Sequence, residues 1–334
     1  MKEDKPRTLR SAFSKLKDDA PLERMARETV LEWFDAKHRK AAGSEILLIN
    51  SLPVDGCPFC GSARIVHDGR RKDGVQTHLC RDCGRRFNPL TGTLFDSHKI
   101  PLSEWLEFLV HVVQLQSTIC ASIDNQNAYN TGRYWLRKLF AALEGFQDDI
   151  RLSGEVGVDE CFLPEKPGDT VLDGDGRRLR GTSRNQYCIY CATDGRNAVL
   201  LPMGKGSPSA SGVRETILPH MKEATGFHDD GDSAHKVIER QLGIPRRTFL
   251  SKETTGLDDS RNPMDDINSV HREFKRLMRA HGAYDREDIR GYCDLESFLY
   301  AHHGDKVSAV MDLLERTIRC KKVMRYRKTL AKKG

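Results

Sequence analysis

The sequence predicts an α/β protein in which a mixed sheet with flanking helices follows a zinc ribbon and a helical segment. Three observations carry this prediction. Two cysteine pairs lie within residues 57–83, the apolar residues of 101–146 repeat with a helical period, and from residue 154 the period changes to two. A chain of 334 residues is long enough to bury more than one core.

The composition is that of a globular protein with a well-solvated surface. Hydrophobic residues make up 38% of the chain and charged residues 31%, with a net charge of +6. Basic clusters at 69–72 and in the C-terminal "CKKVMRYRKTLAKKG" (320–334) favour a nucleic-acid partner only weakly. No stretch approaches the roughly eighteen apolar residues of a membrane span, and "MKEDKPRTLR" lacks the apolar region of a signal peptide. We therefore expect a cytoplasmic protein without a membrane partner, whose cysteines are mostly reduced.

Residues 1–50 are predicted to be a separate, mainly helical segment. The apolar residues of "LERMARETVLEWFDAKHRK" (22–40) recur with a helical period. The following "EILLINSLP" (45–53) is a short apolar run, which we predict to be extended and to lead into the ribbon.

The two cysteine pairs predict a structural zinc ribbon over residues 51–95. Cys57 and Cys60 form one CxxC motif and Cys80 and Cys83 a second, and each motif is followed by a glycine that allows a tight turn. Four thiolates arranged in this way suit tetrahedral Zn²⁺. The ribbon could stabilise the fold through its metal, contact nucleic acid, or do both. The contact would use its basic side chains, which are Arg64, Arg70, Arg71, Lys72, Arg81, Arg85 and Arg86.

The remaining cysteines are predicted to be buried packing residues. Cys188 and Cys191 form a third CxxC, but their context is strand-like, where residues three apart point to opposite faces. The same prediction applies to Cys120, Cys161, Cys293 and Cys320.

Residues 96–150 are predicted to be helical. "PLSEWLEFLVHVVQLQ" (101–116) reads as one helix with proline at its start, and 118–146 reads as two shorter helices broken near 125–130. One interpretation is a DNA-binding helix–turn–helix whose second helix presents Arg133, Arg137 and Lys138. The alternative is a helical spacer packed on three aromatic residues, Trp105, Trp135 and Phe140.

The segment from 151 to 305 is predicted to contain the mixed sheet. Residues 154–163, 185–194 and 197–206 alternate as strands do, and only "DGR" separates the second from the third, which indicates a hairpin. A helix over 209–225 with an internal proline, a helix over 234–243 and a strand at 246–251 follow. Three strands followed by alternating helices and strands favour an α/β domain with an antiparallel portion.

Carboxylates occur at two places beside the predicted strands. Asp159 and Glu160 lie within a strand and must face opposite sides of the sheet, so one of them points at a site and the other at solvent or a basic partner. Asp229, Asp230 and Asp232 follow a short strand, where they could hold a metal ion or form an acidic turn. Asp232 or Ser233 also fits the cap of the next helix.

The order of these motifs resembles bacterial insertion-sequence transposases of the ISXO-two-like group, which carry a zinc ribbon ahead of a DDE-type domain. The resemblance extends from about residue 53 to about residue 300 and is specific in its order more than in any one motif. It rests on "CPFCGS" and "LCRDCGRRFNPLTGTLF" of the ribbon, on "VDE", on "DG–SA" and on "NSVHREFKRLM".

The resemblance implies an RNase H-like fold and a DNA transposase that cleaves element ends and transfers the strands into target DNA. Such enzymes use two divalent ions, which prefer oxygen ligands, so Mg²⁺ or Mn²⁺ is the expected catalytic cofactor. We expect Asp159 and Asp230 to bridge the ions, with Asp232 as the nearest rival. The implied partners are the terminal inverted repeats and target DNA, bound near the bacterial nucleoid by a homodimer or larger assembly.

The helix expected at 265–278 should carry the third catalytic residue, which corresponds to the glutamate of a DDE triad. At 100° per residue, Glu273 lies about 140° from Asn268, near an apolar stripe formed by Ile267, Val270, Phe274 and Leu277. The polar face opposite that stripe carries Asn268, His271, Arg272, Lys275 and Arg279. We therefore expect Asn268 or His271, and not Glu273, to take the third catalytic position.

These candidate side chains suit different roles. The amide oxygen of Asn268 suits Mg²⁺, whereas His271 is a softer ligand that suits Mn²⁺, or a general acid or base. Lys275 would hold a phosphate or a terminal base. Asp265 and Asp266 are predicted to cap the helix.

Two other functions are also compatible with the sequence. The chain could be a non-catalytic zinc-ribbon and helix–turn–helix regulator derived from a transposase, or a nuclease that acts on RNA, or on DNA without strand transfer. The C-terminal helix and basic tail (306–334) could clamp the DNA backbone or be flexible.

Overall fold

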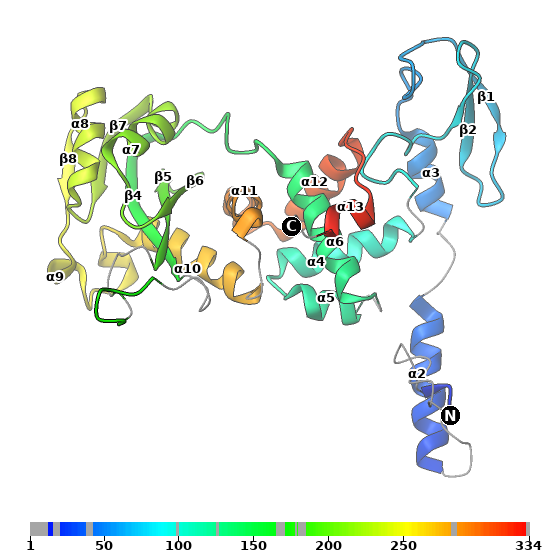
Figure 1. Cartoon of the computed structure of the whole chain (residues 1–334), viewed down its shortest axis with the longest axis horizontal. Helices are drawn as coiled ribbons and strands as arrows, with labels where there is room; N and C mark the ends of the chain where they lie inside the picture. The colour runs from blue at the N-terminus through cyan, green and yellow to red at the C-terminus, as the bar shows by residue number, and fades with distance from the viewer. Residues whose placement is uncertain are drawn as a thin grey trace.

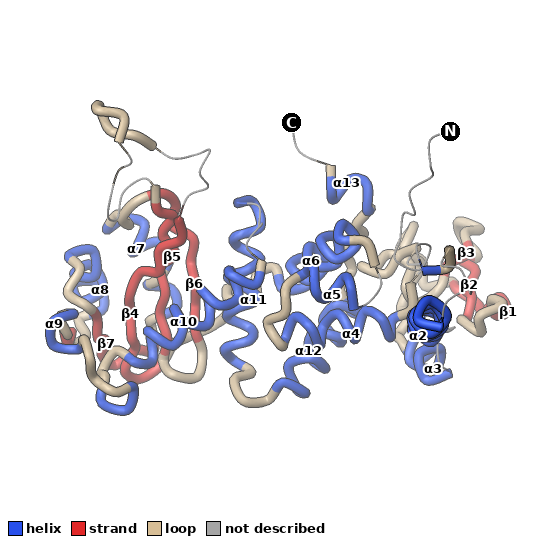
Figure 2. Tube along the Cα trace, turned by 90° about the horizontal axis from the view of Figure 1, so that it is seen from below, coloured by secondary structure: helices blue, strands red, loops and turns tan. Residues whose placement is uncertain are grey.

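The computed structural model of the chain describes residues 13–15, 21–37, 43–97, 100–124, 127–164, 171–177, 179, 185–281 and 286–331. Three parts follow one another along the long axis of the molecule in Figure 1. A five-stranded sheet with its helices lies at one end, a helical section lies in the middle, and a small three-stranded sheet lies at the other end. Figure 2 shows the strands of the larger sheet in red at the far end from β1, β2 and β3.

The N-terminal part contains helices α2 (Pro21–Lys37) and α3 (Gly43–Ser51). The prediction of an extended "EILLINSLP" is wrong, because most of this run forms α3. An apolar run this short fits a strand or a helix equally well, and here tertiary contacts favour the helix. The Glu45 carboxylate accepts hydrogen bonds from the backbone N–H groups of Leu102 (2.8 Å) and Ser103 (3.1 Å), and Ile49 is buried.

The ribbon contains three antiparallel strands, β1 (Ile65–Arg70), β2 (Gln76–Cys80) and β3 (Arg86–Phe87). The loop with Cys57 and Cys60 precedes β1, and the loop with Cys80 and Cys83 connects β2 to β3. Asn50 of α3 holds the hairpin in place, since its side chain accepts from the N–H of Gln76 (2.8 Å) and donates to the carbonyl of Gly74 (3.1 Å).

The middle section contains helices α4 (Leu102–Val113), α5 (Thr118–Asp124) and α6 (Tyr129–Leu143). Its core is an aromatic cluster in which Trp105 contacts Phe95, Phe108 and Trp135 at ring-centroid distances of 5.4 Å. This packing is that of the predicted helical spacer.

Two of the three basic residues that we predicted to face DNA from α6 point inward instead. Arg137 forms a salt bridge with Asp288 (3.1 Å) and donates to the carbonyl of Thr329 (2.6 Å). Lys138 is 1% exposed and lies over the rings of Phe95 and Tyr134. A helix that is covered in this way by other elements has little surface left with which to read a DNA groove.

The larger sheet has the strand order β6-β5-β4-β7-β8. The central strand β4 pairs antiparallel with β5 and parallel with β7, while β5–β6 is antiparallel and β7–β8 is parallel. The strands are β4 (Ser153–Pro164), β5 (Gln186–Thr193), β6 (Ala198–Lys205), β7 (Glu223–Asp229) and β8 (Arg246–Thr248). The predicted mixed sheet with an antiparallel portion is thus confirmed.

Helices cover both faces of this sheet. Helices α10 (Asp265–Ala280) and α11 (Ile289–Ala301) pack on the face that carries Cys161 and Ile189. Helices α7 (Ala210–Thr216) and α8 (Lys236–Leu242) pack on the face that carries Val158 and Tyr190. This part also contains one short helix, α9 (Ser251–Thr254). Its 3₁₀ turns are η2 (Leu218–His220), η3 (Ser233–His235), η4 (Asp259–Arg261) and η5 (Arg286–Asp288).

The helix predicted over 209–225 is much shorter than expected. Helix α7 ends at Thr216, Pro219 lies in the 3₁₀ turn η2, and β7 begins at Glu223. Proline lacks the N–H that an α-helix interior requires, so the helix ends before it. The last three residues that we assigned to this helix, 223–225, therefore belong to a strand.

The C-terminal residues fold back onto the middle section. After α12 (Lys306–Arg319), Lys322 pairs with Glu144 and Arg325 with Asp96 (3.4 Å). The short helix α13 (Tyr326–Leu330) contacts α6 through the rings of Tyr326 and Tyr134. The tail as far as residue 331 therefore contacts the middle section at several points, although most of its side chains are exposed, and its last three residues lie outside the described part of the chain. None of the described helices has the length and apolar character needed to cross a membrane.

Candidate functional site

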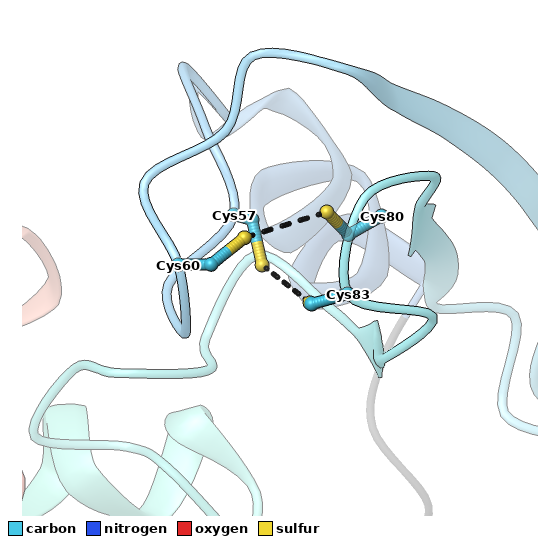
Figure 3. Close-up of side chains that lie close together, drawn as sticks. All are labelled: Cys57, Cys60, Cys80 and Cys83. Carbon is cyan, nitrogen blue, oxygen red and sulfur yellow. Dashed lines mark hydrogen bonds between the residues drawn. The ribbon is translucent and has the colours of Figure 1, made fainter.

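The four ribbon cysteines converge on one point (Figure 3). Their sulfur atoms all lie within 4.8 Å of one another, and the Cys57–Cys83 and Cys60–Cys80 sulfur pairs are 3.6 Å apart. Four thiolates at about 2.3 Å from a tetrahedral ion would be separated by about 3.8 Å. The side chains present therefore fit Zn²⁺. Among the described residues this is the one group of three or more histidine, cysteine, aspartate or glutamate side chains close enough to share an ion in this way.

The chemistry of the cluster also suits a metal. Hydrogen bonds from the backbone N–H groups of Cys83 and Asp82 lower the pKa of the Cys80 thiol to about 6. A thiolate is the form that binds zinc, and a low pKa makes it available near neutral pH. The glycines after each motif, Gly61 and Gly84, have φ values of 75° and 67°, which the tight turns require.

The other cysteines are mostly buried, as predicted. Cys188 and Cys191 are both fully buried, and the pKa of Cys191 is raised well above its ordinary value by burial. Cys161 and Cys293 are also buried, whereas Cys320 is only partly buried. The prediction is wrong for Cys120, which is exposed because it lies on the outer side of α5.

All seven basic side chains of the ribbon are exposed to solvent. Several also have acidic partners, including Arg64 with Asp82 (2.6 Å) and Arg86 with Asp68 (2.5 Å). Exposed pairs of this kind are weak and can open, so they leave the ribbon able to contact a polyanion.

Asp159 and Asp230 are brought together by the parallel pairing of β4 with β7. In this register Val156 lies beside Phe227 and Gly157 beside His228, so the position of Asp159 corresponds to that of Asp230, just beyond the end of β7. Alternation along each strand places both on the face that α10 covers. Asp159 is 20% exposed and Asp230 is partly exposed, so both can be reached from solvent.

The environment of Asp159 disfavours its ionised form. Burial, the negative charge of Asp230 and that of Glu160 raise the pKa of Asp159 to about 7, from an ordinary value of 3.8. A carboxylate in this state is stabilised by a nearby cation.

Glu160 points to the opposite face of the sheet and has the basic partner that we predicted for one of the two. Its Oε1 atom lies 3.0 Å from Nε2 of His235, whose Nδ1 lies 2.8 Å from Oδ2 of Asp229. Asp229 is fully buried and also accepts from Arg246 (2.8 Å) and Thr248 (3.1 Å). The bonds to Asp229 and Glu160 outweigh burial and raise the pKa of His235 to about 10.

The acidic turn after β7 divides its carboxylates between different tasks. Asp232 caps the 3₁₀ turn η3 by accepting from the N–H of Ala234 (2.7 Å), which is the cap role that we predicted for Asp232 or Ser233. Asp230 accepts from the N–H of Asp232 (3.1 Å). Gly231 has φ of 101°, so the turn needs glycine at this point.

His271 of α10 lies over Asp159. Its Nδ1 is 3.7 Å from Oδ2 of Asp159, which is too long for a hydrogen bond, and its buried Nε2 has no partner among the described residues. Burial and the charge of Lys275 lower the pKa of His271 to about 3, so the ring is neutral at ordinary pH. We predicted that His271 lies opposite the apolar stripe, but it is buried at its edge, because α10 packs closely against β4 and β5.

The other candidates on α10 lie at different depths. Asn268 is partly buried one turn before His271. Lys275 is partly buried, and its charge acts on both His271 and Cys161, which places it toward the sheet. Glu273 lies on the other side of the helix, where it pairs with Arg276 (3.7 Å) and lines a cavity with Glu296 of α11.

The first turn of α10 contains a contact that we did not predict. Met264 occupies the cap position without a side-chain cap, so the assignment of Asp265 and Asp266 as caps is wrong. Asp266 instead lies 3.0 Å from Nε2 of His228 on β7. A side chain at Gly157 would meet these two groups at 2.8 and 2.9 Å, so this glycine allows α10 to approach the sheet.

The chain is similar to an uncharacterized protein in transposable element ISH50 of Halobacterium salinarum, with 23% identity over 200 residues. The match covers 57% of this chain and 66% of the relative, just under two thirds of its length. No family model matches the chain. The similarity supports a role connected with a transposable element.

Proposed function

We propose that this protein is a DNA transposase that cleaves the ends of an insertion sequence and joins them to target DNA. The observation that carries the proposal is the position of Asp159 and Asp230, which share one sheet face beneath His271 although they are far apart in the sequence. The similarity to a transposable-element protein supports the choice of substrate.

The domain that holds these residues is proposed to be RNase H-like. Its first three strands form an antiparallel unit and its last two run parallel to β4, with helix α10 crossing the same face as the carboxylates. This arrangement is compatible with the fold that the resemblance to insertion-sequence transposases implies. It also brings the three separate motifs "VDE", "DG–SA" and "NSVHREFKRLM" to one place.

The side chains at this place fit a divalent cation. Asp159 has an unfavourable like-charged neighbour, and a neutral imidazole beside it has no hydrogen-bond partner on Nε2 within the described residues. We propose that Asp159, Asp230 and Asn268 hold Mg²⁺ or Mn²⁺, with His271 as the alternative third ligand. Such ions supply an activated nucleophile and stabilise the leaving oxygen in phosphodiester chemistry.

The chain's own residues then have distinct tasks. Asp159 and Asp230 provide the negative charge that holds the cation. His271 is neutral and offers a nitrogen lone pair to the cation, while Lys275 provides a positive charge beside the sheet for a phosphate. The exposed arginines of the ribbon are proposed to contact the DNA backbone, and two copies of the chain are proposed to hold the two element ends.

The proposal is tested with the charge-removing variants Asp159→Asn and Asp230→Asn. The substrate is labelled DNA that includes the sequences flanking this reading frame, with Mg²⁺ or Mn²⁺ added. We expect cleavage and strand transfer to fall by roughly 10³-fold or more, the scale for groups that act directly on a reaction, while gel-shift binding is unchanged. Glu223→Gln removes an exposed carboxylate at the start of β7 and serves as the matched control.

Three outcomes are informative. Full activity in either variant contradicts the assignment of that residue. DNA binding by the natural protein without metal-dependent cleavage favours the alternative of a non-catalytic regulator. Cleavage without any joined product favours a nuclease that does not transfer strands.

A further inference from the structure

The two proposed metal ligands each have an acidic neighbour that points to the opposite face of the sheet. Glu160 follows Asp159, and Asp229 precedes Asp230. His235 lies between these two neighbours, at 3.0 Å from Glu160 and 2.8 Å from Asp229. The three side chains are nearly or fully buried, at 5%, 0% and 0% exposure for Glu160, His235 and Asp229.

Backbone pairing between β4 and β7 does not extend to the level of the proposed site, although β4 still pairs with β5 there. The β4–β7 ladder covers Ser153–Gly157 on β4 and ends at the pair Gly157–His228. Asp159 and Asp230 both lie beyond this last pair, so the ladder alone does not set the distance between them. The bridge through His235 joins β4 to the end of β7 at this level, on the face of the sheet that α7 and α8 cover.

We infer that His235 is a positioning residue that sets the spacing of Asp159 and Asp230 by holding Glu160 and Asp229 behind them. This inference rests on the proposed function. A side chain that fixes metal ligands from behind changes metal affinity without touching the metal or the substrate.

The two ends of the bridge are not equally dependent on His235. Asp229 keeps its bonds to Arg246 (2.8 Å) and Thr248 (3.1 Å) when His235 is removed. In the described part of the chain, His235 is the hydrogen-bond partner of the Glu160 carboxylate. The ladder with β5 still holds β4 in the sheet at this level. Loss of His235 is therefore expected to change the spacing between Asp159 and Asp230, with the larger loss of restraint at Glu160.

The test measures Mn²⁺ binding by electron paramagnetic resonance in zinc-loaded protein, in which the ribbon cysteines are already occupied. We expect His235→Ala to weaken Mn²⁺ binding by about 10-fold, which is the lower end of the range for groups that orient metal ligands. His235→Gln retains one donor and is expected to lie between the natural protein and His235→Ala. The metal concentration for half-maximal DNA cleavage should shift by the same factor in each variant.

A second buried histidine provides the matched control. His220 is 7% exposed and its ring contacts the carbonyl of Ile150 (2.9 Å), away from the proposed site. His220→Ala should lower the melting temperature as His235→Ala does, but should leave Mn²⁺ affinity unchanged. All comparisons are made at a temperature where circular dichroism shows each variant to be folded, and His235→Gln serves if His235→Ala does not fold.

The outcomes separate this inference from the function on which it rests. If folded His235 variants bind Mn²⁺ as tightly as the natural protein while Asp159→Asn does not, the role of His235 is wrong and the metal site stands. If the natural protein and Asp159→Asn bind Mn²⁺ equally, the metal site is wrong and the role of His235 fails with it. A 10-fold loss in His235→Ala together with an unchanged His220→Ala supports the inference.

Discussion

The two candidate metal centres of this chain are built in opposite ways. The cysteine cluster takes its four ligands from two neighbouring loops within residues 57–83, and the ligand atoms already converge. The acidic site takes its residues from β4, from the turn after β7 and from α10, and they do not form a similarly close group. A set of metal ligands on two adjacent turns can be predicted from the spacing of its residues in the sequence. A set that comes from several elements of a domain depends on the order of the strands in the sheet.

The two centres also differ in how readily their ligands ionise. At the ribbon, backbone N–H groups lower the pKa of Cys80 to about 6 and prepare it for zinc. At the acidic site, burial and a like charge raise the pKa of Asp159 to about 7. The first centre combines one thiol that ionises near neutral pH with two neighbours, Cys60 and Cys83, whose pKa is raised, whereas at the second centre burial and a like charge both oppose ionisation of Asp159 until a cation binds. We therefore expect the first to act in folding and the second in chemistry.

The largest effect that distinguishes the two centres should follow loss of the zinc ligands. Small zinc domains derive about 10–16 kcal/mol from the metal at neutral pH, which exceeds what a ribbon of this size can gain from its core. We expect Cys60→Ser to unfold residues 51–95 and to abolish DNA binding, while the sheet domain keeps its melting transition. Cys120→Ser changes an exposed cysteine outside the cluster and is the control. Hydrogen exchange of the two regions is the measurement, and a ribbon that stays protected in Cys60→Ser contradicts the comparison.

An intermediate effect is expected at the third position of the acidic site. Asn268→Ala and His271→Ala should each reduce metal-dependent cleavage by about 10- to 100-fold, the range for groups that bind or orient a metal. Glu273→Gln should stay within about twofold of the natural rate, because Glu273 pairs with Arg276 and faces Glu296 on the far side of α10. Single-turnover cleavage rates decide this. A folded Glu273→Gln protein without activity would overturn the assignment of faces on α10.

The smallest effect concerns the pH dependence of stability without added Mg²⁺ or Mn²⁺. The folded protein holds a proton on Asp159 up to about pH 7, whereas an unfolded aspartate loses it near its ordinary pKa of 3.8. This group therefore stabilises the fold at low pH, and its contribution is lost as the pH rises from about 4 to about 7.

Asp159→Asn removes this dependence. We expect the variant to melt about 5 °C above the natural protein at pH 8, the shift for a change of one to two kcal/mol in a domain of this size, and to lose that advantage at pH 4. Calorimetry of zinc-loaded protein measures it, with Glu223→Gln as the control. A melting difference that does not vary with pH would mean that Asp159 is not in the environment described.

The same contrast explains how much the sequence alone could predict. The ribbon cysteines, the mixed sheet and the opposite orientation of Asp159 and Glu160 follow from short patterns, because spacing and alternation determine them locally. The pairing of Asp159 with Asp230 could be proposed only from a resemblance, since it depends on which strand lies beside β4.

The errors also have physical causes. The run 45–53 became helix α3 through contacts made by Glu45 and Ile49 with distant residues, which no local pattern contains. Asp266 was assigned to a cap because acidic residues favour helix starts, yet its partner is His228 on a neighbouring strand. His235 was missed as well. Its signal was a histidine five residues after Asp230, but its role depends on carboxylates from two strands.

The most direct test of the central claim is a crystal of the zinc-loaded protein soaked in Mn²⁺ and measured at the manganese absorption edge. We predict an anomalous peak at the face of the sheet between Asp159 and Asp230, beside His271, together with zinc at the four cysteines. In Asp159→Asn the manganese peak should be lost while the zinc peak remains. A soaked crystal with zinc in the ribbon and no manganese at Asp159 would contradict the claim that this chain contains a second, catalytic metal centre.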